Sequence, residues 1–441
     1  MEGPVASRSG LKILARAQHR VSRSQISANA LKVLYRLHHA GFLAYLVGGA
    51  VRDLQLGRRP KDFDVATNAR PQQVRQLFRN ARVIGRRFRL VMVRFSNEIV
   101  EVATFRRSPE PPEAIDAEAP DVLAPAAEAD EFGTPEEDAF RRDFTVNALF
   151  YNVADFSVLD YVGGLDDLGA GVIRTIGPAA ARFTEDPVRM MRAVEYAARL
   201  GFQLDADAAT AIATMHAEIR RASPARIAYE LLESLGSGHA LPIFRGLREA
   251  GLLVHVVPEA VDGQQRDALL WRLLEAADSR IRRSERLAEE TLLALLFVPA
   301  FLAVVPDGPA ATPSAGEVER MIRELVDTPA LRLAFSHYRA HVIRAALLFV
   351  WRFLNPPKSA KVVLRALKHE AFPVAWQLGG ILASEVPEHA VRMRPWTEAV
   401  ARVQAGLAPE VGARHAAGDA AVRRRRGRGG ARRRRKGAPA A

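Results

Sequence analysis

The sequence predicts an α+β protein made of a mixed-sheet head, an all-α second half and a disordered arginine-rich tail. From about Phe42 to Gly177, short apolar strands alternate with helical stretches, as in an α/β or α+β domain. Beyond Gly177 the strand signals stop, and amphipathic helices follow to about Arg402. Residues 423–436 hold nine Arg and one Lys without an acidic residue, a composition that favours disorder.

The N-terminal residues are basic. The first 52 residues contain one acidic residue, Glu2, and are rich in Arg and Ser, which is also typical of a mitochondrial transit peptide. Ser27 can cap a helix in which Leu31, Leu34 and Leu37 recur on one face. We therefore expect a basic segment over residues 1–24 and the folded head from residue 25, with a transit peptide as the alternative for the N-terminus.

The most informative stretch pairs a glycine turn with two aspartates. Gly48 and Gly49 precede Asp62 and Asp64, which flank the single apolar residue Phe63. In a β-strand, side chains at i and i+2 share a face, so we expect the two carboxylates to converge while Phe63 enters the core. Paired carboxylates suit Mg²⁺, which also takes oxygens from substrate phosphates. Since a lone Asp-x-Asp also occurs by chance in solvated turns, the upstream glycines are what indicate nucleotide chemistry.

The next elements form the centre of the predicted sheet. We expect strands at Tyr45–Val47 and Phe63–Ala66, a helix at Arg70–Arg79, and a strand pair at Val91–Phe95 and Ile99–Phe105. On the last strand, Glu101 shares a face with three apolar residues. It is a candidate third carboxylate, and an edge-strand acid that meets solvent or an arginine is the alternative.

An acidic segment interrupts the head. Eleven Asp or Glu and no Lys or Arg lie between Ser108 and Phe140, so residues 108–138 predict a mobile acidic loop with order resuming at Arg141. A hairpin over Phe150–Val153 and Val158–Tyr161 follows. The turn at Gly163-Gly164 then leads into a last strand, Val172–Ile176.

The helix after the head carries the clearest helix signals. Thr184 is the expected N-cap, Pro187 suits the first turn, and Gly201 marks the C-terminal end. Spacings of three and four residues place Met190, Val194 and Ala197 on one stripe, which we expect to pack. A second stripe, available for recognition, holds Asp186, Arg189, Arg192, Tyr196 and Arg199.

Composition bounds the location and the partners. The 441 residues include no cysteine, which excludes disulfides, thiolate metal sites and cysteine nucleophiles. The longest apolar run, Leu292–Val305, contains Pro299 and is too short to span a bilayer, so we expect a cytoplasmic protein without a membrane partner. The formal net charge of +13 lies mostly in the tail, but the rest of the chain is also basic once the acidic segment is set aside. Such a chain suits a polyanionic partner.

Five motifs in order resemble the class II polymerase-β-like nucleotidyltransferases, the group of bacterial poly(A) polymerases and tRNA CCA-adding enzymes. They are Leu46–Asp53, Asp62-Phe63-Asp64, Glu101–Arg106, Arg141–Leu149 and Glu185–Arg189. The segments Gly85–Leu90 and Ser27–Leu37 and the arginine-rich end resemble the poly(A) polymerases in particular. The acidic segment 108–138 departs from the more basic loop expected there.

The resemblance implies template-independent addition of AMP from ATP to RNA 3′ ends. Asp62 and Asp64 would hold two Mg²⁺ ions, with Asp143 as the third functional acid; Asp143 as a helix-start cap is the alternative. The triphosphate would meet Gly48, Gly49 and Arg52, with Arg142 close to the nucleotide and Asn147 near the sugar. Base choice would rest on Asp186 and Arg189, whose alternative is a surface ion pair, and Arg192 is a further residue expected to bind the nucleotide.

The resemblance also divides the chain. It implies a nucleotidyltransferase head over residues 25–177, a helical neck for base selection and RNA binding over 178–240, a helical body over 241–405 and a disordered tail over 406–441. Two other functions stay open: tRNA CCA addition, and RNA binding without catalysis. The partners expected besides ATP and RNA 3′ ends are an RNA helicase or RNA degradation machinery on the helical half.

Overall fold

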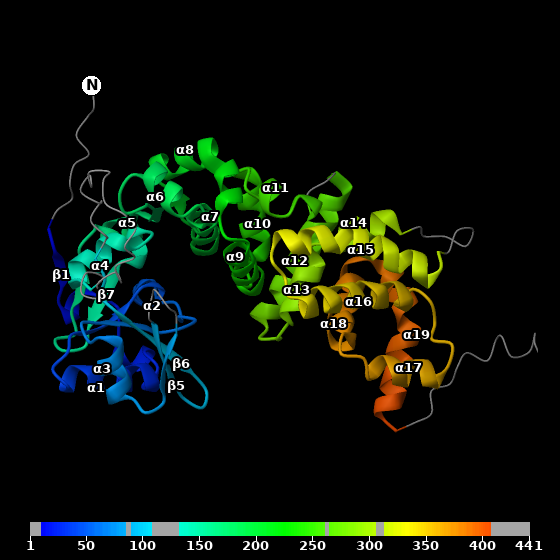
Figure 1. Cartoon of the computed structure of the whole chain (residues 1–441), viewed down its shortest axis with the longest axis horizontal. Helices are drawn as coiled ribbons and strands as arrows, with labels where there is room; N and C mark the ends of the chain where they lie inside the picture. The colour runs from blue at the N-terminus through cyan, green and yellow to red at the C-terminus, as the bar shows by residue number, and fades with distance from the viewer. Residues whose placement is uncertain (1–9, 85–89, 108–131, 261–263, 306–312, 407–441) are drawn as a thin grey trace, which may run out of the picture. The chain divides into compact units, whose positions relative to one another are not determined.

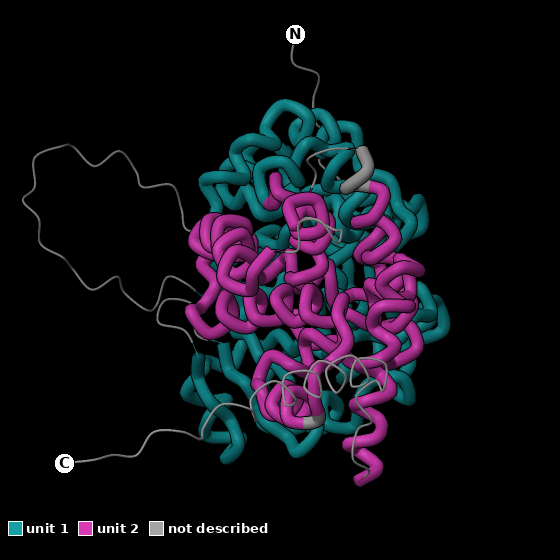
Figure 2. The backbone as a smooth tube through the Cα atoms, turned by 90° about the vertical axis from the view of Figure 1, so that its right-hand side faces the viewer, with its two compact units in different colours: residues 1–226, 242–256 teal, residues 227–241, 257–441 magenta. Residues whose placement is uncertain are grey.

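The protein was analysed as a computed structural model, which describes residues 10–84, 90–107, 132–260, 264–305 and 313–406. The chain forms two compact units (Figure 2). The first comprises residues 1–226 and 242–256, and the second residues 227–241 and 257–441. The segment Gly85–Arg89 and the arginine-rich tail, both singled out in the sequence, lie outside the described residues, as does most of the acidic segment.

An eight-stranded mixed sheet forms the centre of the first unit. Its spatial order is β1-β8-β7-β2-β3-β6-β5-β4, and all neighbours are antiparallel except β3 and β6. The strands are β1 (Lys12–Leu14), β2 (Ala44–Val47), β3 (Asp64–Thr67), β4 (Ala81–Ile84), β5 (Leu90–Arg94), β6 (Ile99–Thr104), β7 (Leu149–Asn152) and β8 (Val158–Asp160). The predicted mixed sheet and its hairpin, β7–β8, are thereby confirmed.

Helices cover both faces of this sheet. On one face, α1 (Ala28–His39) and α3 (Pro71–Leu77) contact each other and the central strands (Figure 1). The predicted cap of α1 is confirmed, because the Ser27 hydroxyl accepts a hydrogen bond from the Ala30 amide at 3.0 Å. On the other face, Tyr45 and Phe150 form a buried cluster with Ala139 of α4 (Pro135–Arg141). The remaining short helices, α2 (Gly49–Gln55) and α5 (Gly164–Ala170), follow glycine turns.

Several predicted boundaries in the first unit are wrong. The sheet begins with β1, which pairs with β8 upstream of the expected start at residue 25; this strand was too short to show an alternating pattern. Asp62 and Phe63 precede β3, and Phe63 is half-buried rather than in the core. Order resumes before Arg141, because Thr134 and Glu137 form a capping box that starts α4.

The transition to the helical half also differs from the prediction. Thr184 is not an N-cap, because it lies inside α6 (Ala179–Glu185), where its hydroxyl donates to the carbonyl oxygen of Ala180 at 2.8 Å. A separate helix, α7 (Val188–Leu200), follows Pro187, which is its N-cap rather than part of its first turn. Its end at Gly201 is as predicted, and Gly201 has a left-handed backbone conformation. The last strand is short: β9 (Val172–Ile173) pairs in parallel with β10 (Gln203–Leu204) outside the main sheet.

The rest of the described chain is helical, which confirms the α+β class with an all-α second half. These helices begin with α8 (Ala206–Met215), α9 (Pro224–Gly236), α10 (Ala240–Glu249) and α11 (Leu253–Val256); α8 and α11 belong to the first unit, and α9 and α10 each have residues in both units. The second unit holds α12 (Gln264–Arg282), α13 (Glu289–Leu295), α14 (Val298–Val304), α15 (Ala315–Arg332), α16 (His337–Phe353), α17 (Ala360–Leu367), α18 (Phe372–Glu385) and α19 (Pro387–Gln404). Over the described ranges, no helix is both long and apolar enough to cross a membrane.

Packing of α16, α18 and α19 builds the centre of the second unit. Phe353 of α16 makes edge-on ring contacts with Phe372 and Trp376 of α18 and with Trp396 of α19, at centroid distances of 5.3–6.2 Å. Aromatic pairs of this geometry add to the stabilisation from burial alone. A buried carboxylate, Asp278 of α12, accepts hydrogen bonds from the amides of Ala240 and Leu241 and so anchors the start of α10.

We expect Gly164→Ala to destabilise the first unit. A β-carbon at Gly164 would lie 2.1 Å from the backbone carbonyl oxygen of Thr145, which cannot move aside without shifting the chain. Overpacking of this kind costs about 1–3 kcal/mol, to be measured as the free energy of unfolding in urea. Gly169→Ala in the same helix is the control, because no atom lies within 4 Å of its β-carbon. Equal stability of the two variants would contradict the close approach.

Candidate active site

The predicted glycine turn joins β2 to α2. Gly48 follows the last residue of β2 and has a φ of 72°, which favours glycine over other residues. A β-carbon here would lie 3.5 Å from an Arg142 guanidinium nitrogen, and one at Gly49 would lie 3.4 Å from an Arg52 guanidinium nitrogen. These are ordinary contact distances, so they show that the Arg142 and Arg52 guanidinium groups lie against the turn, while the positive φ of Gly48 is what favours glycine there.

Strand register places Asp64 beside this turn. Asp64 is the first residue of β3 and lies opposite Val47, the residue directly before Gly48. Directly opposed side chains of an antiparallel pair point to the same face, so the carboxylate lies on the face that carries Val47. On the next strand, Val102 aligns with Val65 in parallel, which puts Glu101 level with Asp64. The structure thus brings Gly48, Asp64 and Glu101 together at one end of the central strands.

The carboxylates of this group perturb one another. Burial raises the pKa of Asp64 to about 7; repulsion from Asp62 and Glu101 contributes to the rise, and Arg142 opposes it. Burial and the Asp62 carboxylate also raise the pKa of Glu101. Such carboxylates gain most from a nearby cation, because a positive charge removes the repulsion that disfavours their ionised forms.

The residues fit a cation that takes its remaining ligands from a substrate. Within the described ranges, no three His, Cys, Asp or Glu side chains lie close enough to share one metal ion, so Glu101 does not complete such a site with Asp62 and Asp64. The repulsion that raises their pKa values acts over longer distances than a metal–ligand bond. Two aspartates remain, and Mg²⁺ is commonly held by one or two carboxylates plus substrate phosphates.

A second group of predicted residues forms a continuous hydrogen-bond network. The buried Arg52 donates to Asn147 at 2.6 Å and to Asp53 at 2.8 Å. Asn147 in turn donates to Asp143 at 3.2 Å, which accepts from Arg192 of α7 at 2.7 Å. The Arg52 guanidinium group therefore already has hydrogen-bond partners inside the protein. Its direct contact with a triphosphate stays a prediction.

The pKa of Asp143 shifts in the opposite direction to those of Asp64 and Glu101. Burial alone would raise its pKa, but Arg192 and hydrogen bonds from Asn147 and the Phe144 amide hold the pKa below its ordinary value. The carboxylate is thus ionised and neutralised by an arginine. It accepts from the Phe144 amide at 2.8 Å, but Phe144 is itself the N-cap of the short 3₁₀ helix at Thr145–Asn147, which has no side-chain cap, so the capping alternative is not formed.

Two residues that the sequence did not single out, Asp138 and Arg182, hold Arg141 and Arg142 in place. Arg142 donates to Asp138 of α4 at 2.9 Å and lies over the Phe150 ring at 5.1 Å. From α6, Arg182 donates to the backbone carbonyl oxygens of Arg141 and Arg142 at 2.9 and 2.7 Å. The i, i+4 spacing of Asp138 and Arg142 was a usable signal. No spacing in the sequence connects Arg182 to Arg142.

The predicted base-reading residues do not pair with each other. Asp186 accepts from Arg226 at 2.6 Å, and Arg189 donates to Glu185 at 2.9 Å. The ion pair between Asp186 and Arg189, the alternative to base reading, is therefore not formed. Each side chain instead has its own charged partner that fixes its orientation.

Two family models match parts of this chain. Residues 44–174 match the model described as "Poly A polymerase head domain". Residues 201–262 match the model described as "Probable RNA and SrmB- binding site of polymerase A". The first match contains the glycine turn, the aspartate pair and the Arg142 segment.

Individual relatives agree with these matches. The Poly(A) polymerase I of Salmonella typhi is 46% identical over 298 residues, which are 66% of this chain and 64% of that protein. The CCA-adding enzyme of Lactobacillus gasseri is 33% identical over 265 residues, 57% of this chain and 63% of that protein. The chain thus spans a little under two thirds of these relatives' own length, and the resemblance read from the motifs is confirmed over that part.

Solved structures support the same fold. The crystal structure of the Bacillus stearothermophilus CCA-adding enzyme in complex with CTP covers 83% of this chain and 81% of its own, with 26% identity and a TM-score of 0.57. A mixed sheet followed by helices is therefore an arrangement that this chain shares with a nucleotide-binding protein.

Asp64→Asn should stabilise the metal-free protein above neutral pH. The pKa of Asp64 is about 7 in the fold against an ordinary value of 3.8, so the folded protein binds the proton more tightly and loses stability as pH rises between these values. The variant lacks this loss. Its gain should be absent below about pH 4 and complete above about pH 7, with an upper limit of about 4 kcal/mol at 1.36 kcal/mol per pKa unit.

Urea unfolding with a chelator at several pH values measures this gain. Asp62→Asn is the control, because Asp62 is exposed and carries only part of the repulsion, so its gain should be smaller. A stabilisation by Asp64→Asn that does not change with pH would contradict the assignment to this ionisation.

Proposed function

We propose that this protein adds AMP from ATP to RNA 3′ ends without a template. The observation that carries the proposal is the register of β2 and β3, which sets Asp64 opposite Val47 and next to the Gly48-Gly49 turn. Arg142 lies against the same turn. A carboxylate, a glycine turn open to close approach and an arginine together suit a nucleoside triphosphate bound with a divalent cation.

In the proposed reaction, the oxygen of the RNA 3′-hydroxyl forms a bond to the α-phosphorus of ATP. The bond from this phosphorus to the bridging oxygen breaks, pyrophosphate leaves, and the hydroxyl proton passes to water. Arg142 supplies positive charge beside the triphosphate, and the glycine amides can donate to its oxygens. Asp62 and Asp64 would hold Mg²⁺, two ions by the family resemblance, which when bound supplies charge neutralisation and activates the hydroxyl.

Base choice in this proposal rests on Asp186 and Arg189. An acceptor and a planar donor fork can bind complementary groups on the edge of a base. Arg226 and Glu185 hold these two side chains at 2.6 and 2.9 Å, which limits the geometries they can offer. A base read by protein side chains needs no nucleic-acid template.

The choice of polyadenylation over CCA addition rests on the comparisons. Identity to the Salmonella typhi poly(A) polymerase is 46% over 66% of this chain, against 33% over 57% for the Lactobacillus gasseri CCA-adding enzyme. CCA addition remains the second candidate, because the solved CCA-adding enzyme in complex with CTP has the same fold. RNA binding without catalysis is the third, and an activity assay distinguishes it.

RNA would be held mainly by the helical part. Residues 201–262 match a model whose description names RNA, which supports this placement. We also propose a cytoplasmic site of action. RNA binding by the tail and docking of an RNA helicase or degradation machinery stay predictions.

The purified protein with Mg²⁺ and an oligoadenylate primer should incorporate ATP in preference to CTP, GTP and UTP. Asp62→Ala and Asp64→Ala should each reduce incorporation at least about a hundredfold, because both are expected to hold the ion that stabilises the transition state. Primer binding should persist in both variants. CTP incorporation into a tRNA that lacks its CCA end would instead support the second candidate, and no incorporation of any nucleotide would support the third.

Arg189→Ala should reduce the preference for ATP over CTP about tenfold or more, since loss of one base-edge hydrogen bond to a charged group is worth about 1.5–3 kcal/mol. The ratio of kcat/KM for the two nucleotides measures this. Arg221→Ala is the control, because Arg221 is exposed, pairs with Glu218 at 3.0 Å and is not among the residues proposed to contact the nucleotide. Equal losses for both nucleotides would assign Arg189 to the fold or the phosphates instead.

A further inference from the structure

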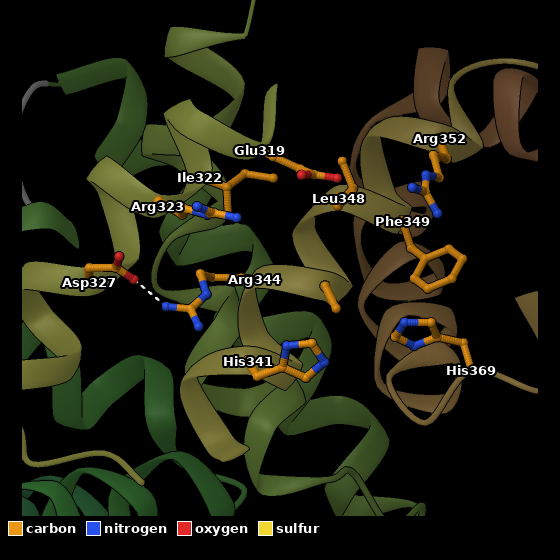
Figure 3. A pocket seen from close by; sticks show the side chains of 11 residues that line it. Glu319, Ile322, Arg323, Asp327, His341, Arg344, Leu348, Phe349, Arg352 and His369 are labelled. Atoms are coloured by element: carbon orange, nitrogen blue, oxygen red, sulfur yellow. Dashed lines mark hydrogen bonds and ion pairs between the residues drawn. The ribbon is translucent and has the colours of Figure 1, made fainter. Parts of the chain in front are cut away.

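The second unit contains a pocket that the proposed reaction does not use. Its volume is about 500 Å³, within the range of small-ligand sites. Side chains of α15 and α16 line it, together with His369, which follows α17 (Figure 3). All of its lining residues lie outside the segments matched by the two family models.

Positive charge dominates the lining. Three arginines, Arg323, Arg344 and Arg352, face two acids, Glu319 and Asp327. Arg344 is bound to Asp327, as the dashed line in Figure 3 marks, so this pair is neutral. Arg323 and Arg352 are exposed, which leaves two guanidinium groups against the single carboxylate of Glu319. An anionic ligand is therefore favoured.

The same pocket offers aromatic surface. Phe349 lines it, is almost completely buried and contacts the His369 ring edge-on at a centroid distance of 5.2 Å. His341 is exposed, and its ring is nearly parallel to that of His369, with an interplanar angle of 22° and a centroid distance of 6.4 Å. Nucleobases stack on aromatic and histidine faces with little regard to sequence.

We propose that this pocket binds the RNA strand, with phosphates at Arg323 and at Arg352, which lie on opposite sides of the pocket in Figure 3, and with a base against the histidines. Guanidinium groups beside flat rings are the combination that single-stranded nucleic acids require. The inference rests on the proposed function insofar as RNA is the substrate. It adds a second point of attachment, within the helical unit, that would hold the strand between additions.

Charge changes on α15 test this proposal directly. Labelled oligoadenylate is titrated with the full-length protein in the absence of ATP, and fluorescence anisotropy gives the Kd at several salt concentrations. Arg323→Gln should raise the Kd about 3- to 10-fold, as expected for one lost charge-assisted contact, and make the slope of log affinity against log salt shallower by about 0.7. Glu319→Gln should instead lower the Kd, because it removes the carboxylate that opposes a phosphate.

Two matched controls lie on the same helix. Arg320 and Glu324 are exposed on α15 and do not line the pocket, so Arg320→Gln and Glu324→Gln change the net charge equally without altering it. Their Kd values should stay within about twofold of wild type, since exposed charges that do not contact the bound strand are largely screened by salt. Tighter binding by Glu319→Gln cannot result from misfolding, which makes this variant the decisive one.

Specific outcomes would overturn the assignment. If Arg323→Gln and Arg320→Gln weaken binding equally, general electrostatic attraction explains the effect and the pocket does not bind RNA. If Glu319→Gln leaves the Kd unchanged, the phosphate is not held there. The binding assay contains no ATP and is independent of the incorporation assay. A wild-type protein that binds oligoadenylate but adds no AMP would refute the proposed reaction, and the same variants would still test RNA binding by the pocket.

Discussion

The register between β2 and β3 is the constraint on which the candidate site depends. Because Val47 lies opposite Asp64, the end of one strand and the beginning of the next meet at the glycine turn. The parallel pairing of β3 with β6 then sets Glu101 level with Asp64. A shift of one residue would move Asp64 to the opposite face of the sheet, away from the turn. The buried cluster that includes Tyr45, Ala66 and Phe150 fixes the register, since the same shift would expose it.

Arginines link this sheet to the helices that follow. Arg192 of α7 binds Asp143, and Arg182 of α6 donates to the backbone carbonyl oxygens of Arg141 and Arg142. Displacement of α6 or α7 would therefore move the arginine expected to contact the nucleotide. These bonds connect α6 and α7, which contain or flank the residues proposed to read the base, with the Arg141–Asp143 segment, which is proposed to hold the phosphates. They are partly buried, and salt therefore screens them weakly.

The two proposed binding regions differ in the sign of their charge. At the glycine turn, carboxylates that repel one another would also repel an anionic substrate, and a bound cation would remove this repulsion. In the pocket of the second unit, arginines outnumber acids, so an anion can bind directly. A protein that retains one strand while exchanging nucleotides benefits from this difference, because binding of the strand would not depend on the metal-bound triphosphate.

The sequence alone determined the fold class, the central strands, and the helix ends at Ser27 and Gly201, which follow from local periodicity and from capping residues. Motif spacing singled out Asp62 and Asp64 as candidate metal ligands, whereas Asp143 came from the family resemblance. The sequence did not reveal that Asp143 is neutralised by Arg192, that Arg52 is buried against Asn147, or that Arg182 fixes Arg142, since these contacts join residues 40 to 95 positions apart. Nor could the sequence show that, among the described residues, Glu101 does not lie close enough to Asp62 and Asp64 for all three to share one metal ion. Spacing reports which side chains share a face, whereas partners and distances are set by the packing of strands and helices that no local pattern encodes.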